Sequence, residues 1–362
     1  MKLHCVPIVV PLAILLVSAC VEIGPEYPDR EPAQMLEAAT VDPADVNTTL
    51  LRVMSYNIKF GGARIDFFFD GWGERVHMST AEVEANLDGV LGLIAEIEPD
   101  ILLLQEVDRG SRRTAFVDQA QYLLDHSELN YGAYTHAWKA NFVPDHGLGE
   151  VDMGVMIASR YPLEDAERID QGAIDEQDPI TQAFYLRRAM LKAAVRISPG
   201  RQVHVIDVHT AAYSTDGTKQ RQIDQVHAEA KATPGVLIVG GDFNALPPGA
   251  KKLEGFADEK AILTAEPVHY RGESTWMQGM YDLLNPAIPL DDYLADEARY
   301  HSASVNKDVF WTRRLDYLFS RDQWSKGGSI LQRVGDKLIK PIKNDPMKLS
   351  DHAPIAALLP LQ

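Results

Sequence analysis

Eight polar residues that could do chemistry sit inside or at the ends of apolar, strand-like runs of this 362-residue chain. A single buried carboxylate is usually a hydrogen-bonded core residue. Several of them at separate strand ends indicate a shared site instead, because like charges cannot share a low-dielectric pocket without a counter-ion. The set holds four carboxylates, two amides and two histidines: Glu106, Asp242, Asp316, Asp351, Asn57, Asn244, His209 and His352.

The donor types favour one kind of metal. Oxygen ligands such as Glu106, Asp351 and Asn57 suit a hard divalent cation, Mg²⁺ or Mn²⁺, better than zinc. The sequence has no HExxH or CxxC motif, and its only cysteines are Cys5 and Cys20. A zinc hydrolase is therefore not expected.

Apolar strands and amphipathic helices alternate along the chain and would position these residues. Residues 52–60 alternate as a β-strand does and end at two glycines. Ser79 and Glu82 predict a capping box for a helix that ends before Pro99, and residues 218–232 predict a second helix. Further strands are expected at 100–108, 153–162, 202–210, 235–244, 314–320 and 352–360. No linker interrupts residues 50–362, so we expect one α/β domain.

The N-terminus has the pattern of a targeting segment. Lys2 is followed by an apolar stretch, residues 6–17, which is short for a membrane span. The segment LVSAC, ending at Cys20, is similar to a bacterial lipobox, and the alternative is an ordinary secretory signal with an incidental cysteine. We expect residues 1–19 to be a signal peptide and residues 20–49 to be a flexible tether attached to the membrane through lipidated Cys20. Four prolines within 22–46 favour the tether.

Charge restricts the partners. The chain carries 52 acidic and 35 basic residues, a net charge of −17, and no basic run longer than two residues. Nucleic-acid binding depends on lysine and arginine contacts to phosphates, so nucleic acid is a disfavoured partner. We expect a monomer.

Six motifs in order resemble the endonuclease/exonuclease/phosphatase superfamily, which has the DNase-I-like fold. They are SYNIK, PDILLLQEVD, DVHT, GGDFN, RLDYLF and LSDHAP, between residues 55 and 354. The resemblance implies a four-layer sandwich of two mixed sheets packed face to face with helices outside. It also implies a site where strand ends meet at one edge of that sandwich.

The resemblance implies a role for each polar residue. Glu106 would be the main metal ligand, with Asn57 and Asp351 as further metal ligands. Asp242 would orient and deprotonate the attacking water. The remaining roles concern the phosphate: Asn244 would hold a phosphoryl oxygen or the water, His209 and His352 would stabilise developing charge, and Asp316 would pair with His352.

Two features add to the family pattern. Residues 61–78 lengthen the chain between the first two motifs, and their aromatic stretch Phe67 to Trp72 could contact substrate or lipid, or pack under a loop. Three arginines near the motifs could bind phosphate or form surface salt bridges: Arg160, Arg187 and Arg188.

The sequence favours a Mg²⁺-dependent phosphoesterase in the cell envelope, on the periplasmic or extracellular side. Its substrate would be a small or lipid-linked phosphate ester, either a diester or a monoester. An extracytoplasmic nuclease is the alternative with the same chemistry. A non-catalytic binding lipoprotein is the alternative of another class, although the complete motif set argues against it.

Overall fold

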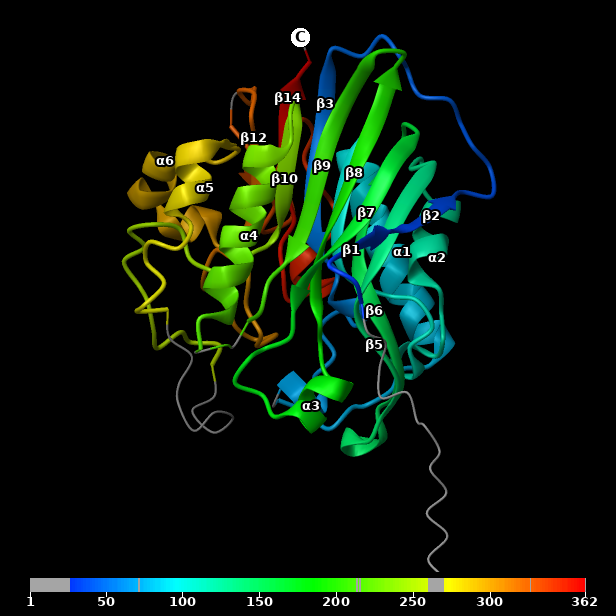
Figure 1. Cartoon of the computed structure of the whole chain (residues 1–362), viewed down its shortest axis with the longest axis vertical. Helices are drawn as coiled ribbons and strands as arrows, with labels where there is room; N and C mark the ends of the chain where they lie inside the picture. The colour runs from blue at the N-terminus through cyan, green and yellow to red at the C-terminus, as the bar shows by residue number, and fades with distance from the viewer. Residues whose placement is uncertain are drawn as a thin grey trace, which may run out of the picture.

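Two seven-stranded mixed sheets packed face to face form the protein (Figure 1). The computed structural model describes residues 27–361 except 71, 213, 215, 260–269 and 326. The predicted signal peptide and Cys20 lie outside these residues. The fold predicted from the resemblance, a four-layer sandwich, is confirmed.

The first sheet has the strand order β1-β7-β8-β9-β10-β12-β11. Its strands β9 and β10 are parallel, and the other neighbours are antiparallel. The strands are β1 (Arg30–Pro32), β7 (Leu163–Gly172), β8 (Arg188–Ser198), β9 (Arg201–His209), β10 (Leu237–Asp242), β11 (Asn285–Pro286) and β12 (Asp316–Ser320).

The second sheet has the strand order β13-β14-β3-β4-β6-β5-β2. Its strands β3 and β4 are parallel, and the other neighbours are antiparallel. The strands are β2 (Gln34–Glu37), β3 (Leu50–Asn57), β4 (Ile101–Asp108), β5 (Tyr131–Val143), β6 (Gly149–Ser159), β13 (Ser329–Ile330) and β14 (Ile355–Pro360).

Helices cover the outer faces of both sheets (Figure 1). The predicted capping box is present at α1, where the Ser79 hydroxyl accepts from the Glu82 amide and the Glu82 carboxylate accepts from the Ser79 amide. Within the described chain, no helix has both the length and the apolarity needed to cross a membrane. The α-helices are α1 (Thr80–Ile97), α2 (Gln119–Asp125), α3 (Pro179–Phe184), α4 (Thr218–Ala232), α5 (Gln278–Leu283) and α6 (Leu290–Ala295). The 3₁₀ turns are η1 (Lys59–Gly61), η2 (Phe68–Asp70), η3 (Arg112–Thr114), η4 (Asp145–Gly147), η5 (Glu297–Tyr300) and η6 (Pro346–Lys348).

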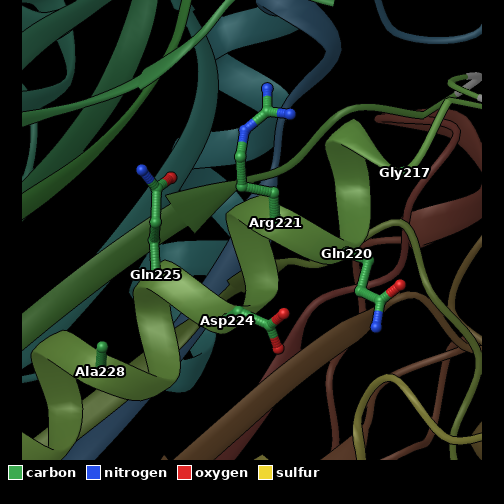
Figure 2. A pocket seen from close by; sticks show the side chains of 6 residues that line it. All are labelled: Gly217, Gln220, Arg221, Asp224, Gln225 and Ala228. Carbon is green, nitrogen blue, oxygen red and sulfur yellow. The ribbon is translucent and has the colours of Figure 1, made fainter.

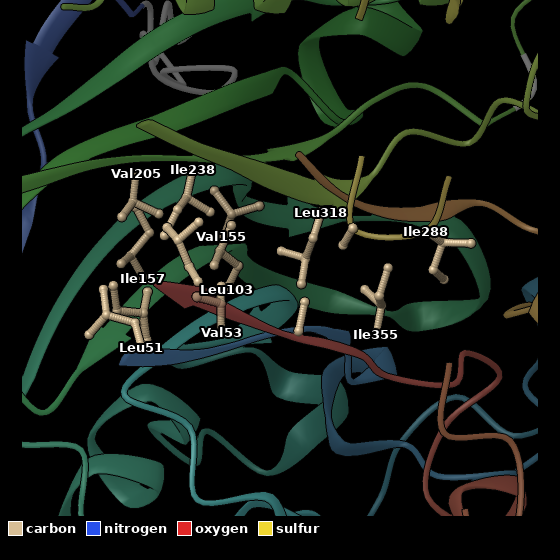
Figure 3. Packing of buried hydrophobic residues seen from close by; sticks show 14 of the residues in the cluster. Leu51, Val53, Leu103, Val155, Ile157, Val205, Ile238, Ile288, Leu318 and Ile355 are labelled. Carbon is tan, nitrogen blue, oxygen red and sulfur yellow. The ribbon is translucent and has the colours of Figure 1, made fainter. Parts of the chain in front are cut away.

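Alternation along each strand builds three apolar layers. Val53 and Leu103 point between the sheets, where they pack with residues of the opposite sheet such as Ile238 (Figure 3). Their neighbours Met54 and Leu102 point outward and pack against α1. Because the strands are buried on both faces, their sequences are almost continuously apolar. Each strand is thereby held rigidly, including its polar end.

The expected tether is wrong for residues 30–37, which form edge strands. Arg30–Pro32 pairs with β7 in the first sheet, and Gln34–Glu37 pairs with β5 in the second. Ala33 alone separates the two strands, and its amide donates to the carbonyl of Ala166. Pro32 lies at the outer edge of the first sheet, the position where a strand tolerates proline. Proline content therefore did not indicate a free tether here.

Candidate active site

The strand ends that carry the polar residues meet at one edge of the sandwich. Asp242, at the end of β10, lies opposite His209 on β9 and Asp316 on β12. In the facing sheet, Asn57 ends β3 opposite Gln105 of β4. Contacts between these groups, given below, show that the two sheets bring the predicted residues together.

Glu106 reaches the edge through a β-bulge. The pairing of β4 with β6 shifts register between Leu104 and Val107, and Glu106 has a φ of +56°. This left-handed backbone is strained for a residue with a Cβ and is typical of functional positions. The bulge turns the Glu106 carboxylate to within hydrogen-bonding distance of the Asn57 amide nitrogen, at 3.2 Å.

Asp242 lies at the centre of the cluster and is buried. Its Oδ2 is 3.2 Å from the Asn57 amide nitrogen, 3.4 Å from His209 Nε2 and 3.6 Å from His352 Nε2. Its Oδ1 accepts the backbone N–H of Asn244 at 2.9 Å. One carboxylate oxygen is thus fixed by the chain, while the other faces both imidazoles.

Asn57 is oriented by its own loop. Its Oδ1 accepts the backbone N–H of Lys59 at 3.0 Å, so its nitrogen rather than its oxygen faces the two carboxylates. In this orientation Asn57 bridges Glu106 and Asp242. Its role as a metal ligand stays a prediction.

His352 is paired with Asp316, as predicted. The His352 Nδ1–H donates to Asp316 Oδ2 at 2.8 Å, and the Ser302 hydroxyl donates to the same oxygen at 2.6 Å. This pairing fixes which imidazole nitrogen faces Asp242. Burial opposes protonation, but Asp316 and Asp242 together raise the pKa of His352 to about 10.

The second histidine has the opposite electrostatics. Burial, followed by the charges of Arg188 and His352, holds the pKa of His209 well below its usual value. Burial also raises the pKa of Asp242 to about 7 against the opposing effect of His352. The site therefore combines a cationic imidazole, a neutral imidazole and a carboxylate that can exchange a proton near neutral pH.

The carboxylates of this edge fit a hard divalent cation. Burial and then the Asp351 charge raise the pKa of Glu106, as expected for acids that lack sufficient positive charge. The Oδ1 atom of Asp316 is buried without a hydrogen-bond partner. Asp242, Asp316 and His352 also have potential ligand atoms within 4.8 Å of one another, a group that could hold a metal ion.

Asp351 is held beside a lysine. Its Oδ2 is 3.8 Å from the Nζ of Lys59, which also contacts Asp70 at 2.8 Å. Burial acts against ionisation, but Lys59 and His352 lower the pKa of Asp351 below its usual value. Asp351 is consequently ionised at neutral pH and lies near Glu106.

The sequence matches the profile of the Endonuclease/Exonuclease/phosphatase family over residues 54–352. The chain belongs to this family. Five of the six motifs that carried the resemblance lie within the match, and the last, LSDHAP, extends two residues beyond it. The site contains all eight predicted residues except Asn244, which joins it through Asp242.

Several solved structures share the fold at low sequence identity. An endonuclease/exonuclease/phosphatase from Beutenbergia cavernae is 16% identical, with a TM-score of 0.51 over 87% of this chain and 72% of that chain. A mannosyl-6-phosphatase from Bacteroides thetaiotaomicron is 12% identical, with a TM-score of 0.50 over 85% and 99%. D. rerio TDP2 complexed with a single-strand DNA product is 15% identical, with a TM-score of 0.50 over 86% and 99%. No curated protein matches the sequence.

Asn244 occupies a strained turn that a buried lysine supports, and reasoning from the sequence missed this lysine. Asn244 has a φ of +47°, and its side-chain amide donates to the Thr210 carbonyl at 3.0 Å. Lys219, at the start of α4, donates to the Asn244 carbonyl at 2.8 Å and to both Glu273 oxygens at 2.9 Å. A lysine in an amphipathic helix is normally a surface residue, so no sequence signal marked this one.

The three candidate arginines have different surroundings. Arg160 lies at the opposite end of the sandwich, where its backbone N–H donates to the Asp100 carbonyl before β4 begins. Arg187 forms an ion pair with Asp170 at 3.2 Å. Arg188 is buried at the start of β8, close enough to His209 to lower its pKa. Only Arg188 thus lies beside the candidate site.

The aromatic stretch of the insertion is partly core. Phe67 is buried and stacks on Phe69 at 5.3 Å, while Phe69 keeps 41% of its surface exposed. Asp70 anchors the turn through Lys59. Packing under a loop accounts for Phe67, whereas Phe69 is available for contact.

A shallow depression on α4 is separate from this site. Figure 2 shows that its lining comes from a single helix, so no second element converges there. Its Arg221 is already paired with Asp175 at 2.5 Å. The lining residues are Gly217, Gln220, Arg221, Asp224, Gln225 and Ala228.

Proposed function

We propose that this protein is a metal-dependent phosphoesterase that hydrolyses a small or lipid-linked phosphate ester outside the cytoplasm. The observation that carries the proposal is the buried Asp242 carboxylate with one oxygen 3.4 Å from His209 and 3.6 Å from His352. An oxygen so placed can hold a water between a neutral and a cationic imidazole. Family membership supports phosphoester hydrolysis as the reaction class.

The residues of the chain divide the work of hydrolysis. Asp242 orients the attacking water and accepts its proton, which its pKa of about 7 permits at neutral pH. His352, kept cationic by Asp316, stabilises the charge that develops on the phosphoryl oxygens. His209 donates a hydrogen bond to the same group, and Asn244 positions the phosphate or the water.

A divalent cation, Mg²⁺ or Mn²⁺, would be held by the carboxylates of Glu106 and Asp351, and by Asn57 if its amide turned its oxygen toward them. When bound, such an ion supplies positive charge that neutralises phosphate oxygens and lowers the pKa of a bound water. The surplus of carboxylates at this edge supports its presence, since Glu106 has a raised pKa without it.

The charge of the chain supports a substrate with few phosphates. A nuclease neutralises several phosphates along a strand, whereas this chain has a net charge of −17. A nuclease remains the second candidate, because the TDP2 relative of similar fold was solved with a DNA product. We also propose a monomer attached to the cell envelope through lipidated Cys20, on the periplasmic or extracellular side.

Hydrolysis of bis-p-nitrophenyl phosphate with and without Mg²⁺ tests the reaction. We expect activity that EDTA abolishes and Mg²⁺ restores, and a loss of at least about a hundredfold in Asp242→Asn. Asp224→Asn, on the exposed face of α4, is the matched control and should retain full activity. Activity indifferent to EDTA, or a fully active Asp242→Asn, would contradict the proposal.

A substrate panel tests the specificity. At equal phosphate concentration we expect at least about tenfold faster turnover of a phospholipid or inositol phosphate than of duplex DNA, because the chain lacks a basic track for a polymer. Efficient nicking of plasmid DNA at physiological salt, with no activity on small or lipid esters, would favour the nuclease.

A further inference from the structure

Exposed aromatic side chains gather on the loops around the catalytic edge. Phe116 follows β4 beyond Glu106, and Phe310 follows the turn that begins at Ser304, whose backbone N–H donates to the Asp351 carbonyl. The other exposed aromatic side chains of the described chain lie in the η2 turn, near the end of β5 and before β8: Phe69, Phe142 and Tyr185. Exposed aromatic groups gathered at one place mark an interaction surface.

We define the aromatic rim as Phe69, Phe142 and Tyr185, whose chain neighbours Phe68, Val143 and Leu186 pack in one apolar cluster. The exposed fractions of the three rim residues are 41%, 58% and 38%. The ring of Phe68, the neighbour of Phe69, stacks on His146 at 4.3 Å and so joins the η2 turn to the β5–β6 hairpin. At the base of that hairpin, Trp138 lies 5.9 Å from Tyr185.

The hairpin projects beyond the catalytic residues. Gly154 of β6 lies opposite both Val107 of β4 and His136 of β5. Gly154 and His136 therefore lie at the same height along the strands as Glu106. The pairing then continues to Val143 opposite Gly149. At about 3.3 Å per residue, Val143 lies about 20 Å past that level along the strand. Phe142 is therefore carried well past the strand ends that hold the site.

The N-terminal chain enters the fold from this same end. Arg30 of β1 pairs with Ile169 of β7, and Ile169 pairs with Met190 of β8. Met190 lies near the start of β8, which is the end of this strand close to His209. The ring of Tyr27 packs over Arg168 at 3.8 Å. From Tyr27 back to Cys20 the chain can span at most about 25 Å, at about 3.6 Å per residue.

We infer that the catalytic edge faces a lipid bilayer, with the aromatic rim seated among its headgroups. The inference rests on the proposed lipid anchor at Cys20 and specifies the substrate class as a phosphoester presented at that surface. The short chain from Cys20 to Tyr27 joins the fold at the catalytic end, so an anchor at Cys20 brings this end, and not the opposite one, to the membrane. Phenylalanine and tyrosine suit the interface, and the net charge of −17 favours neutral over anionic lipid.

Single-cysteine labelling of the lipidated full-length protein tests the orientation. Cys5 leaves with the signal and Cys20 carries the lipid, so an introduced cysteine would be the only thiol. Phe142→Cys places a fluorescent label on the rim. Val46→Cys places it at the opposite end, where the neighbouring Asp45 carbonyl accepts from the Tyr161 hydroxyl, and its exposure of 51% is similar to that of Phe142.

In phosphatidylcholine vesicles that contain a spin-labelled lipid, we expect the label at 142 to be quenched at least about twofold, as for groups that insert into the headgroup region. The label at 46 should be unaffected. Equal or stronger quenching at 46, or a wild-type protein that carries no lipid, would overturn the inference.

Replacing the rim separates surface binding from chemistry. The triple variant Phe69→Ser, Phe142→Ser and Tyr185→Ser should lose at least about tenfold in turnover of a vesicle-embedded phosphoester, because it loses interfacial apolar area. Its hydrolysis of bis-p-nitrophenyl phosphate should be unchanged. Equal rates on vesicles for the triple variant and the wild type would overturn the inference. Quenching at 142 without any hydrolysis would instead contradict the proposed function and leave the orientation supported.

Discussion

Replacement of Lys219 should separate the stability of the fold from the geometry of the site. Lys219→Met removes the ammonium that contacts both Glu273 oxygens and the Asn244 carbonyl, while it keeps most of the side-chain volume. Both Lys219 and Glu273 are buried. Removing one partner of a buried ion pair costs about 3–5 kcal/mol, and here Glu273 loses the ammonium that contacts both of its oxygens.

That cost is a large part of the stability of the protein, since globular domains unfold with about 5–15 kcal/mol. The Asn244 carbonyl also loses its donor, a loss of about 1–3 kcal/mol for a buried acceptor. Because Asn244 already has a φ of +47°, relaxation of its turn would move both its amide and the N–H that fixes Asp242. We expect at least about a tenfold loss of turnover, which corresponds to about 1.4 kcal/mol of lost transition-state stabilisation.

Two measurements on two variants distinguish the effects. Urea unfolding followed by circular dichroism gives stability, and hydrolysis of bis-p-nitrophenyl phosphate gives turnover. Lys219→Met/Glu273→Gln should recover most of the stability, because both charges of the ion pair are removed together, yet remain impaired in turnover because Asn244 still lacks the lysine donor. Lys231→Met, in the exposed last turn of α4, is the control. A destabilisation below about 1 kcal/mol, or full activity in the double variant, would refute this reasoning.

Three further predictions concern the site. Glu106→Gln should keep the fold, weaken Mg²⁺ binding measured by calorimetry and abolish most hydrolysis, and unchanged Mg²⁺ affinity would exclude Glu106 as a ligand. Asp316→Asn and His352→Ala should each reduce turnover about a hundredfold, with the double variant no worse than His352→Ala; additive losses would argue against a working pair. Gly241→Ala should destabilise the protein by more than about 3 kcal/mol in urea unfolding, because its Cβ would lie 2.0 Å from the Val208 carbonyl oxygen at a φ of +129°, and a smaller loss would show that β10 can shift.

The strands and their polar ends could be predicted because the information is local. An apolar run such as residues 235–244 predicts a strand, and its abrupt end in Asp242 and Asn244 indicates a site. The pairing of His352 with Asp316 was available only from the resemblance, and the structure bears it out at 2.8 Å.

Features set by distant partners were not predictable. The run LLLQEVD predicts a continuous strand, whereas Glu106 lies in a bulge, after which the pairing with β6 resumes at Val107 opposite Gly154. A Cβ on Gly154 would lie 1.9 Å from the Thr135 carbonyl oxygen, so this contact is visible only in the assembled sheet. Lys219 likewise meets Glu273, which is 54 residues away.

The paired strands β1 and β2 also determine when the fold can be completed. Arg30 contacts Glu167, 137 residues later, and Gln34 contacts His136, 102 residues later. Strands β1 and β2 are synthesised before β5 and β7 and cannot pair until those strands exist. Contacts that close such long loops form late in folding. Until then both sheets have an open edge on the same side, where another chain could pair.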